Sequence, residues 1–310
     1  MSKALITGGA GFIGSHLCDY LLKEGLEVIC LDNLLTGSER NIKYLLDNSK
    51  FKFIKADVTE PVNLEVDCIF HLASPASPID YQNHSEETLL ANSEGTLNML
   101  KLALKNKAKI LVASTSEVYG DPKEHPQKET YWGNVNSFGP RSCYDESKRF
   151  GEAATYVYIN NHGVDARIVR IFNTYGPRMQ KDDGRVVSNF INQAIEGNPL
   201  TVYGKGEQTR SFCYVSDLVE GIYKAMFTEG TRGEVINLGN PDEYKIIDLA
   251  EKIKKLTNSN SEIIFKDLPP DDPTQRQPDI SKAKNLLSWE PKVKVDEGLQ
   301  KTIEYYCNLK

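Results

Sequence analysis

Two short segments carry side chains that could perform acid–base chemistry on an alcohol. The first contains Thr115, Ser116 and Glu117, and the second contains Tyr144 and Lys148. If the second segment begins a helix, Tyr144 and Lys148 lie one turn apart on the same face. A lysine ammonium there would favour the phenolate and lower the tyrosine pKa from its usual value of about 10. Such a phenolate could take the proton of an alcohol while a hydride leaves the carbon.

Glu117 adds a second titratable group, which a simple alcohol oxidation does not need. The chain therefore looks built to oxidise a substrate and then to change it further. A Tyr-x-x-x-Lys match is common in proteins, and Tyr156 and Tyr158 indicate that tyrosines also lie on ordinary helix faces in this chain. The interpretation therefore depends on whether the rest of the chain can bind a hydride acceptor.

The N-terminal segment has the pattern of a dinucleotide-binding turn. A short apolar strand leads into Gly8, Gly11 and Gly14, and an apolar-periodic helix follows. Glycines at this spacing permit a tight turn and a close approach of the backbone to a pyrophosphate, which the helix N-terminus then binds. A second strand, 27–31, ends at Asp32, about twenty residues after the glycines, where a carboxylate can bind the ribose hydroxyl of NAD.

We expect NAD because a carboxylate at this position would repel the additional phosphate of NADP. NADP stays an alternative, since further residues could shape the same pocket: Asn33, Thr36, Gly37 and Arg40.

These side chains need a scaffold that brings them to one place. Strands predicted at 51–55, 68–72, 109–113 and 166–172 alternate with helices, of which the longest are predicted at about 85–107 and 145–161. This rhythm predicts an α/β fold with a doubly wound, parallel, Rossmann-type sheet over residues 1–172. Ligands of such sheets bind beyond the carboxyl ends of the strands. Because the candidate residues follow predicted strands, we expect them to line a single cleft.

Beyond residue 172 the loops become richer in proline and glycine, and the predicted helices become shorter. We place these helices at about 184–196, 216–228, 246–257, 281–288 and 296–307. We interpret residues 173–310 mainly as a smaller α/β lobe that binds the substrate, with some segments returning to the sheet. A guanidinium grips phosphate or carboxylate with two hydrogen bonds. The arginines of this half therefore suggest a substrate with several negative charges: Arg178, Arg185, Arg210 and Arg276.

Composition limits the classes of function. Of the 310 residues, 40% are hydrophobic and 26% are charged, and the net charge of −6 gives no support for binding nucleic acid or a membrane surface. We expect no membrane span and no signal peptide, because no apolar run is long enough and the N-terminus enters a strand at once. The six cysteines lack the spacing of a disulfide or metal framework, so we expect free thiols, no metal site and a cytoplasmic location.

The motifs together resemble those of the extended short-chain dehydrogenase/reductase family, which contains nucleotide-sugar epimerases, dehydratases and decarboxylases. The segments that carry this resemblance are 7–14, 114–120, 144–148 and 173–178. Within the family, the chain is closely similar to the UDP-glucuronate decarboxylases, also called UDP-xylose synthases, through segments 71–78, 144–149, 182–190 and 271–280. The resemblance covers nearly the whole chain. It begins at residue 1, so we expect no membrane anchor of the kind that some eukaryotic members carry.

The resemblance implies that NAD accepts a hydride from carbon 4 of UDP-glucuronate, with the tyrosine as the base and the lysine tuning it. The 4-keto sugar would then lose carbon dioxide, because the ketone takes up the electrons as an enolate that the two hydroxyls stabilise. Glu117 and Arg276 would orient the carboxylate end and help to protonate carbon 5. Return of the hydride gives UDP-xylose and regenerates NAD. The implied catalytic residues are Tyr144, Lys148, Thr115, Ser116, Glu117 and Arg276.

The same matching implies the residues that bind each ligand. The NAD site would contain Gly8, Gly11, Phe12, Ile13, Gly14, Asp32, Asn33, Thr36, Gly37, Asp57, Val58, Leu72, Ala73, Ser74, Tyr144 and Lys148. The UDP-sugar would contact Tyr81, Asn173, Arg178, Arg185, Val187, Asn189, Tyr203, Arg210 and Arg276. Members of the family usually form homodimers through the two long helices, so we expect a homodimer here through 85–107 and 145–161.

Three alternatives remain open. A nucleotide-sugar 4-epimerase acting on UDP-glucose or UDP-glucuronate would share the cofactor site and Tyr144, but it would not need Glu117 paired with Arg276. An enzyme resembling dTDP-glucose 4,6-dehydratase would need an aspartate as general acid where this chain has Ser116. A catalytically silent NAD-sensing or scaffold protein could use the same fold, although such proteins often lose the tyrosine or the lysine.

Overall fold

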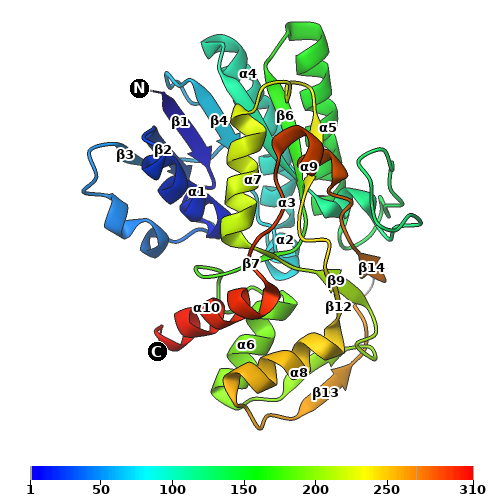
Figure 1. Cartoon of the computed structure of the whole chain (residues 1–310). Coiled ribbons are helices and arrows are strands. Elements are labelled where there is room, and N and C mark those ends of the chain that lie inside the picture. Colours follow the sequence, from blue (N-terminus) through cyan, green and yellow to red (C-terminus); the bar gives the residue numbers. More distant parts are fainter. Residues whose placement is uncertain (1, 270, 310) are drawn as a thin grey trace.

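A computed structural model describes residues 2–269 and 271–309, which form a large α/β part and a smaller lobe beside it (Figure 1). Within these residues the large part contains a seven-stranded sheet of order β11-β6-β5-β4-β1-β2-β3, and every neighbouring pair is parallel. The doubly wound parallel sheet predicted from the sequence is therefore confirmed. Its strands are β1 (Lys3–Thr7), β2 (Glu27–Asp32), β3 (Phe51–Lys55), β4 (Cys68–His71), β5 (Lys109–Thr115), β6 (Ala166–Ile171) and β11 (Val235–Leu238).

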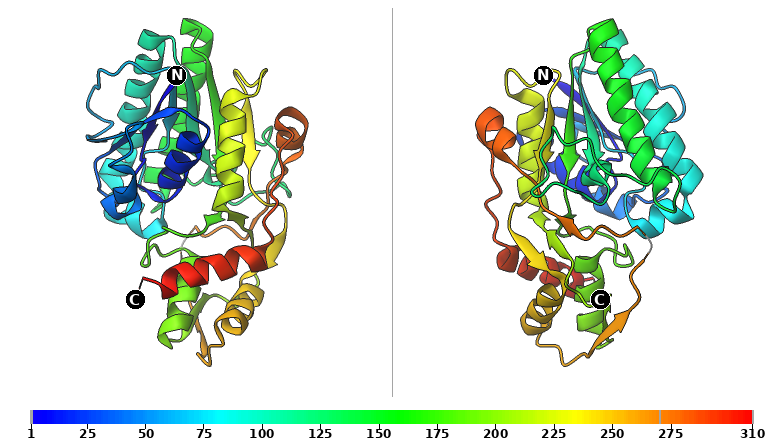
Figure 2. Two further views of the ribbon diagram at one scale, coloured as in Figure 1. Left: turned by 60° about the vertical axis from the view of Figure 1, so that its left-hand side comes forward. Right: turned by 90° about the vertical axis from the view of Figure 1, so that its right-hand side faces the viewer.

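Helices cover both faces of this sheet (Figure 2). On β1, Ile6 joins a core with Leu17 of α1 (Phe12–Lys23) and Leu218 of α7 (Val215–Phe227). Leu5, which precedes Ile6 on β1, belongs to a second core with Met99 of α4 (Thr96–Asn106). Because side chains alternate along a strand, a run that is apolar at every position is buried on both faces.

The two longest predicted helices pack against each other on the second face. The run predicted at 85–107 is helical from Ser85 to Asn106, as α3 (Ser85–Leu90), a π-helical turn (Ala91–Gly95) and α4. Its partner is α5 (Ser142–His162), which carries the Tyr-x-x-x-Lys segment. At the π-helical turn, Asn92 donates a hydrogen bond of 3.0 Å to the hydroxyl of Ser147, which ties the two helices together near the start of α5.

The smaller lobe contains three of the predicted short helices, α6 (Val186–Glu196), α8 (Ile246–Thr257) and α10 (Val295–Cys307) (Figure 1). Strand β8 (Leu200–Tyr203) pairs in parallel with β13 (Ile263–Lys266), and β7 (Thr174–Tyr175) pairs with β10 (Cys213–Tyr214). A small sheet of order β12-β9-β14 lies near the large sheet, with β9 (Thr209–Ser211), β12 (Glu243–Lys245) and β14 (Gln275–Arg276).

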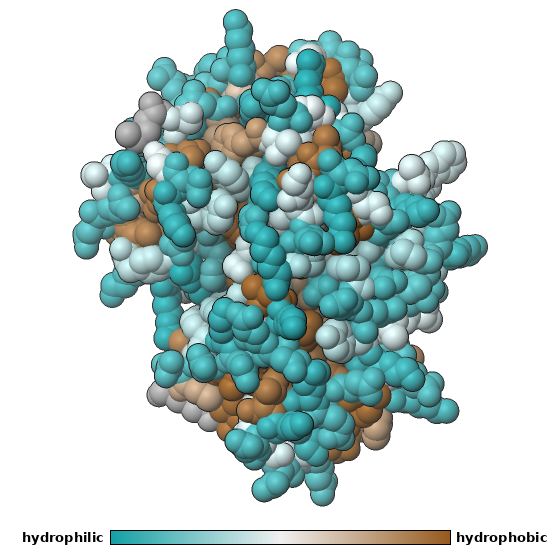
Figure 3. All heavy atoms as spheres, viewed as in Figure 1, coloured by the Kyte–Doolittle hydropathy of each residue, from teal (hydrophilic) through white to brown (hydrophobic). Residues whose placement is uncertain are grey.

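The chain returns to the large sheet after residue 172. Strand β11 pairs with β6, α7 packs on the first face, and α9 (Ser281–Leu287) packs beside β11. The domain division at residue 172 stays a prediction. Hydrophilic side chains cover most of the face shown in Figure 3. None of the helices in the described residues is long and apolar enough to cross a membrane.

Candidate active site

The carboxyl ends of β1, β2, β4 and β5 meet at the edge of the sheet that faces the smaller lobe (Figure 1). A cavity of about 650 Å³ lies there, which is within the usual range for small-molecule sites. It brings together the predicted residues Gly8, Gly11, Phe12, Ile13, Gly14, Asp32, Asn33, Thr36, Gly37, Asp57, Val58, Leu72, Ala73, Ser74, Tyr81, Thr115, Ser116, Glu117, Tyr144, Lys148, Asn173, Arg185, Val187, Asn189, Tyr203 and Arg210. Two predicted residues, Arg178 and Arg276, are not part of the lining and are discussed below.

The glycine turn between β1 and α1 has no room for a side chain at Gly8 or at Gly14, in the first turn of α1. Gly8 has a φ of +70°, and a Cβ at this position would lie 2.9 Å from the backbone of Ala73, just beyond β4. A Cβ at Gly14 would lie 2.1 Å from the carbonyl oxygen of Gly8. No side chain caps the N-terminus of α1, where Gly11 is the capping residue. The turn therefore presents backbone N–H groups in the way that a bound pyrophosphate requires.

Asp32 ends β2 and fixes this turn. Its carboxylate accepts hydrogen bonds from the backbone N–H groups of Ala10 at 3.0 Å and Leu34 at 2.8 Å. Burial raises the pKa of Asp32 above its ordinary value, while the two backbone hydrogen bonds act to lower it. A Cβ at Gly37 would lie 2.7 Å from the Asp32 carboxylate, so the backbone passes close to it. The glycine cradle, the uncapped helix and the terminal carboxylate together fit a dinucleotide.

A second carboxylate lies next along this edge. Asp57 follows β3 and accepts a hydrogen bond of 2.7 Å from Asn33 and two from Thr59, at 2.9 and 2.7 Å. Burial acts to raise the pKa of Asp57, but these hydrogen bonds outweigh it and lower the pKa. Asp57 is therefore an ionised hydrogen-bond acceptor on the predicted cofactor side of the cavity.

Tyr144 and Lys148 lie in the first turns of α5, beside Thr115 at the end of β5. The Lys148 ammonium is 5.7 Å from the centre of the Tyr144 ring and donates a hydrogen bond of 2.9 Å to the carbonyl of Ala113. Tyr81 of α2 (Pro78–Asn83) stacks on Tyr144, with ring centres 4.9 Å apart and planes inclined by 6°. The ring of Tyr144 is thus held in place by its neighbours before any substrate binds.

Burial has more influence on the pKa of Tyr144 than the lysine has. Burial raises this pKa to about 12, although a hydrogen bond with Thr115 lowers it. Burial also lowers the pKa of Lys148 to about 8. The expectation that Lys148 would lower the tyrosine pKa below its usual value is therefore wrong for the protein chain by itself, because both groups are buried and burial disfavours both charged forms.

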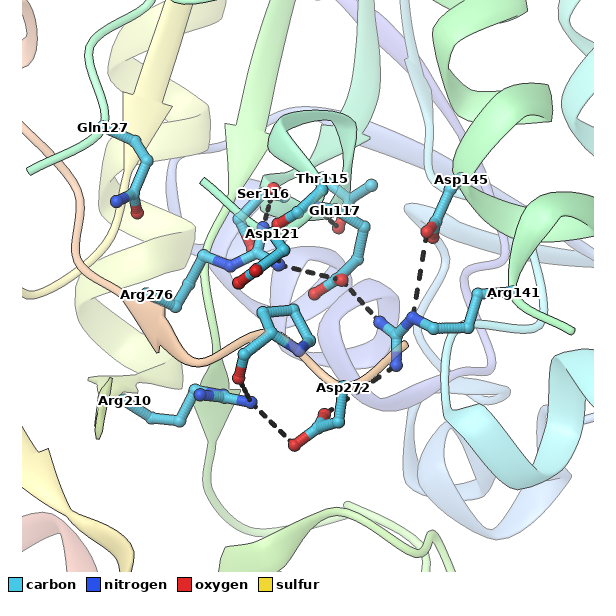
Figure 4. Close-up of polar contacts among 12 residues, drawn as sticks. Thr115, Ser116, Glu117, Asp121, Gln127, Arg141, Asp145, Arg210, Asp272 and Arg276 are labelled. Atoms are coloured by element: carbon cyan, nitrogen blue, oxygen red, sulfur yellow. Dashed lines mark hydrogen bonds and ion pairs between the residues drawn. The ribbon is translucent and has the colours of Figure 1, made fainter. Parts of the chain in front are cut away.

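Two arginines hold Glu117 (Figure 4). One oxygen of Glu117, Oε2, lies 2.5 Å from Nη2 of Arg141 and 3.1 Å from Nη2 of Arg276. Burial acts to raise the pKa of Glu117, but the charges of Arg276 and then Arg141 lower it to about 2. Glu117 is therefore a carboxylate at neutral pH and carries no proton that it could give to a substrate.

Arg276 lies behind Glu117 rather than in the cavity. Its side chain is only 1% exposed, and it donates hydrogen bonds to the carbonyl oxygens of Ser116 and, at 3.0 Å, Gly120. The prediction that Arg276 contacts the substrate is not supported by this position. Arg276 is a positioning residue, because it fixes the turn that carries Ser116 and Glu117.

Arg141 is the functional residue that sequence reasoning missed. It lines the cavity, and besides Glu117 it approaches Asp145 at 3.8 Å and Asp272 at 4.0 Å (Figure 4). The signal that could have found it is its spacing, since it precedes Tyr144 by three residues and Asp145 by four, the helical spacing of side chains on one face.

Asp145 is an unusual carboxyl group in this cluster. Its side chain is buried, and one of its oxygens, Oδ1, has no hydrogen-bond partner. Burial and then the charge of Glu117 raise its pKa to about 7, while Arg141 acts in the opposite direction. Asp145 can therefore gain or lose a proton near neutral pH.

The other predicted arginines differ in their positions. Arg178 lies outside the cavity, where it pairs with Asp19 of α1 at 2.7 Å and lies over the ring of Tyr44 at 5.3 Å. Its predicted contact with UDP is therefore not supported. Arg185 lines the cavity and makes two hydrogen bonds of 2.6 Å to Asp183.

Comparisons with known proteins place the chain among nucleotide-sugar enzymes. A family model described as GDP-mannose 4,6 dehydratase matches residues 5–302. UDP-glucuronic acid decarboxylase 1 of Xenopus tropicalis is 55% identical over 304 residues, which cover 98% of this chain and 72% of that protein. UDP-glucuronic acid decarboxylase 6 of Arabidopsis thaliana is 57% identical over 298 residues, which cover 96% of this chain and 86% of that protein.

A solved structure adds ligands to this comparison. The UDP-glucuronic acid 4-epimerase of Bacillus cereus, in complex with UDP-glucuronic acid and NAD, superposes with a TM-score of 0.91. The two sequences are 33% identical, and the match covers 99% of this chain and 100% of the epimerase chain.

Proposed function

The chain belongs to the extended short-chain dehydrogenase/reductase family, in the group described as GDP-mannose 4,6 dehydratase, and on that premise we propose that it decarboxylates UDP-glucuronate to UDP-xylose with NAD as cofactor. The observation that carries this proposal is the ionised Glu117, which Arg276 and Arg141 hold in the cavity near enough to Tyr144 for its charge to raise the tyrosine pKa. A 4-epimerase, which only returns the hydride to the other face of the ketone, has no use for such a carboxylate.

The first step is the oxidation of carbon 4. Tyr144 takes the proton of the sugar hydroxyl, and Thr115, which is hydrogen-bonded to the phenol, directs the tyrosine toward the same oxygen. Bound NAD supplies the hydride acceptor and, in its oxidised form, a positive charge that favours the phenolate. The glycine turn and Asp32 would hold the cofactor, with Asn33 and Asp57 beside it.

The second step is the loss of carbon dioxide from the 4-keto sugar. The bond between carbon 5 and the carboxylate breaks, and its electrons move to the ketone oxygen. The hydroxyls of Thr115 and Ser116, at the end of β5, can donate hydrogen bonds to that oxygen. Because Glu117 is ionised at neutral pH, it can accept a hydrogen bond from a water molecule that gives a proton to carbon 5, and the hydroxide that remains takes a proton from the solvent. Tyr144 then returns its proton to the ketone oxygen as the hydride returns to carbon 4.

Incubation of the purified protein with UDP-glucuronate and NAD, without reductant, tests the proposal. We expect mass spectrometry to record the loss of carbon dioxide, and proton NMR to give a UDP-pentose of xylo configuration with no net NADH. The Tyr144→Phe variant is the inactive control. An unchanged mass with a galacto-configured sugar would establish an epimerase instead, and a product that has lost water would establish a dehydratase.

We also propose that the chain is a homodimer that uses α3, α4 and α5. Exposed apolar side chains gather on these neighbouring helices: Leu89, Leu104, Phe150, Tyr156 and Val157. A second copy could bury them in a four-helix bundle. Light scattering after gel filtration should give twice the chain mass of 34.8 kDa. The Tyr156→Glu variant should be monomeric, and a monomeric wild-type protein would refute the proposal.

We propose a cytoplasmic location. All six cysteines, which lie within the described residues, are free thiols, and free thiols are typical of reducing compartments. Cell fractionation of the tagged protein is the test, and recovery with secreted proteins would refute this location.

A further inference from the structure

Asp272 lies between two arginines of the cavity (Figure 4). Its Oδ2 is 3.0 Å from Nη2 of Arg210, and its Oδ1 is 4.0 Å from Nη1 of Arg141. The same nitrogen of Arg210 donates a hydrogen bond of 2.7 Å to the carbonyl of Pro273. Asp272, Arg210 and Arg141 all line the cavity. Two guanidinium groups that could bind an anionic substrate are therefore already paired with a carboxylate of the protein.

Asp272 belongs to a strap, residues 271–276, which hydrogen bonds anchor on both sides of it. Asp271 accepts a hydrogen bond of 3.0 Å from Asn136, and Thr274 donates two hydrogen bonds of 3.0 Å to Asp121. Beyond Thr274 the strap continues as β14, which pairs with β9. The side chain of Asp272 is 27% exposed, so its carboxylate can turn away from the arginines while the backbone of the strap stays in place.

The end of the strap holds the turn that carries Glu117. Arg276, in β14, fixes the turn with Glu117, and the register of β14 places Arg276 opposite Arg210. Removal of the strap would therefore disrupt the catalytic turn. A change confined to the Asp272 carboxylate leaves this anchor in place.

We propose that Asp272 is a resident counter-carboxylate, which an oxygen of the diphosphate in the UDP-sugar replaces on Arg210. The inference rests on the proposed function, because it takes a UDP-sugar as the ligand. Carboxylates and phosphates both present oxygen pairs that match a guanidinium, so one can substitute for the other. Asp272 neutralises Arg210 while the site holds no UDP-sugar, and it competes with the diphosphate when one binds. This competition lowers the affinity for UDP-sugars and makes release of the nucleotide-sugar product easier.

Two matched variants of the full-length protein separate this role from a general effect of charge. Asp272→Asn removes the competing charge with little change of shape. Asp271→Asn removes the same charge from the neighbouring residue, which contacts Asn136 and has a φ of +59° that asparagine tolerates. Titration calorimetry with UDP measures the affinity of each protein, uridine serves as a ligand without phosphate, and thermal melting confirms that each variant is folded.

We expect Asp272→Asn to bind UDP about tenfold more tightly than wild type, which corresponds to about 1.4 kcal/mol. Asp271→Asn should stay within about twofold of wild type, uridine affinity should not change in either variant, and the gain in UDP affinity should shrink as salt is added. In turnover assays, the Asp272→Asn variant should have a lower KM for UDP-glucuronate. A purely structural role would instead weaken binding.

Two results would overturn the inference: a UDP affinity in Asp272→Asn that is unchanged or weaker, or an equal gain in Asp271→Asn. In both cases wild type still binds UDP and turns over UDP-glucuronate, so the proposed function stands. If wild type binds UDP but leaves UDP-glucuronate unchanged, the proposed reaction fails while the prediction for Asp272 is still tested by the UDP titrations.

Discussion

Replacement of Glu117 by glutamine tests the electrostatics of the site directly. Both arginines approach the same carboxylate oxygen of Glu117, and the side chain of Arg276 is 1% exposed. Glutamine keeps the shape of the side chain and removes its charge, so it imitates a glutamate that is always protonated. The variant should therefore have the stability that wild type would have if Glu117 could not ionise.

The magnitude follows from the pKa of Glu117. Burial opposes ionisation, but Arg276 and Arg141 outweigh it and lower the pKa from 4.5 to about 2. A change of this size favours the ionised folded state by about 3 kcal/mol. Because the pKa is depressed, this stabilisation is present above the unfolded-state value near 4.5 and is lost as the pH falls through about 2. Glu117→Gln should therefore lose about 3 kcal/mol at neutral pH and about 2 kcal/mol at about pH 3.5.

Urea unfolding of wild type and Glu117→Gln at these two pH values measures both differences. Glu124→Gln, at an exposed position, is the control for the loss of one charge. UDP affinity should stay close to that of wild type, while turnover of UDP-glucuronate falls. Equal free energies of unfolding for wild type and Glu117→Gln at neutral pH would refute the argument that the two arginines hold an ionised carboxylate.

Three further predictions concern Tyr144, Arg178 and Asp145. Tyr144→Phe should reduce the formation of UDP-xylose by roughly a thousandfold or more, since it removes the acid–base group, while calorimetry still detects UDP binding. Arg178→Gln should change UDP affinity by less than about twofold and the melting temperature by about 2 °C or less, because Arg178 pairs with Asp19 outside the cavity. Burial raises the pKa of Asp145 to about 7, so its contribution to stability is complete below an unfolded-state value of about 4 and is lost as the pH rises through about 7. Asp145→Asn should therefore raise the melting temperature relative to wild type at about pH 8 but not at about pH 4.

The edge of the sheet that forms the site could be predicted because each signal is local. Thr7, Asp32 and Thr115 each end a short apolar strand, and parallel strands bring such ends to one edge. The glycine turn and the helical spacing of Tyr144 and Lys148 are also patterns of neighbouring residues. These features need only the periodicity of the chain and the geometry of a parallel sheet.

The sequence could not tell which of the predicted arginines line the cavity, because their environments depend on distant segments. Arg276 is buried since β14 brings it under the turn of Glu117, which is 159 positions away in the chain. Arg178 is drawn out of the cavity by Asp19 of α1. From the sequence, any of these guanidinium groups could face the cavity, and the tertiary pairing determines which of them do.

The direction of the pKa shift of Tyr144 could not be predicted from the sequence, for a related reason. A lysine one helical turn away acts to lower the pKa of a tyrosine, whereas burial acts to raise it. Spacing reveals the lysine but not the depth of burial, and burial raises this pKa to about 12. The protein chain therefore holds Tyr144 as a neutral phenol, and the positive charge of a bound oxidised cofactor would favour the phenolate that the oxidation needs.

In the charged cluster around Glu117, binding of an anionic substrate should depend on the positions and protonation of the carboxyl groups. Three guanidinium groups face three carboxyl groups: Arg141, Arg210 and Arg276, and Glu117, Asp145 and Asp272. Such a cluster is close to neutral, so an incoming anion meets little net positive charge unless a carboxylate moves away or takes up a proton. Asp272 is free to turn away, and Asp145 has a pKa of about 7. Glu117 can neither turn away nor take up a proton at neutral pH, because Arg141 and Arg276 hold it and lower its pKa. Its carboxylate is therefore the fixed negative charge of the cluster.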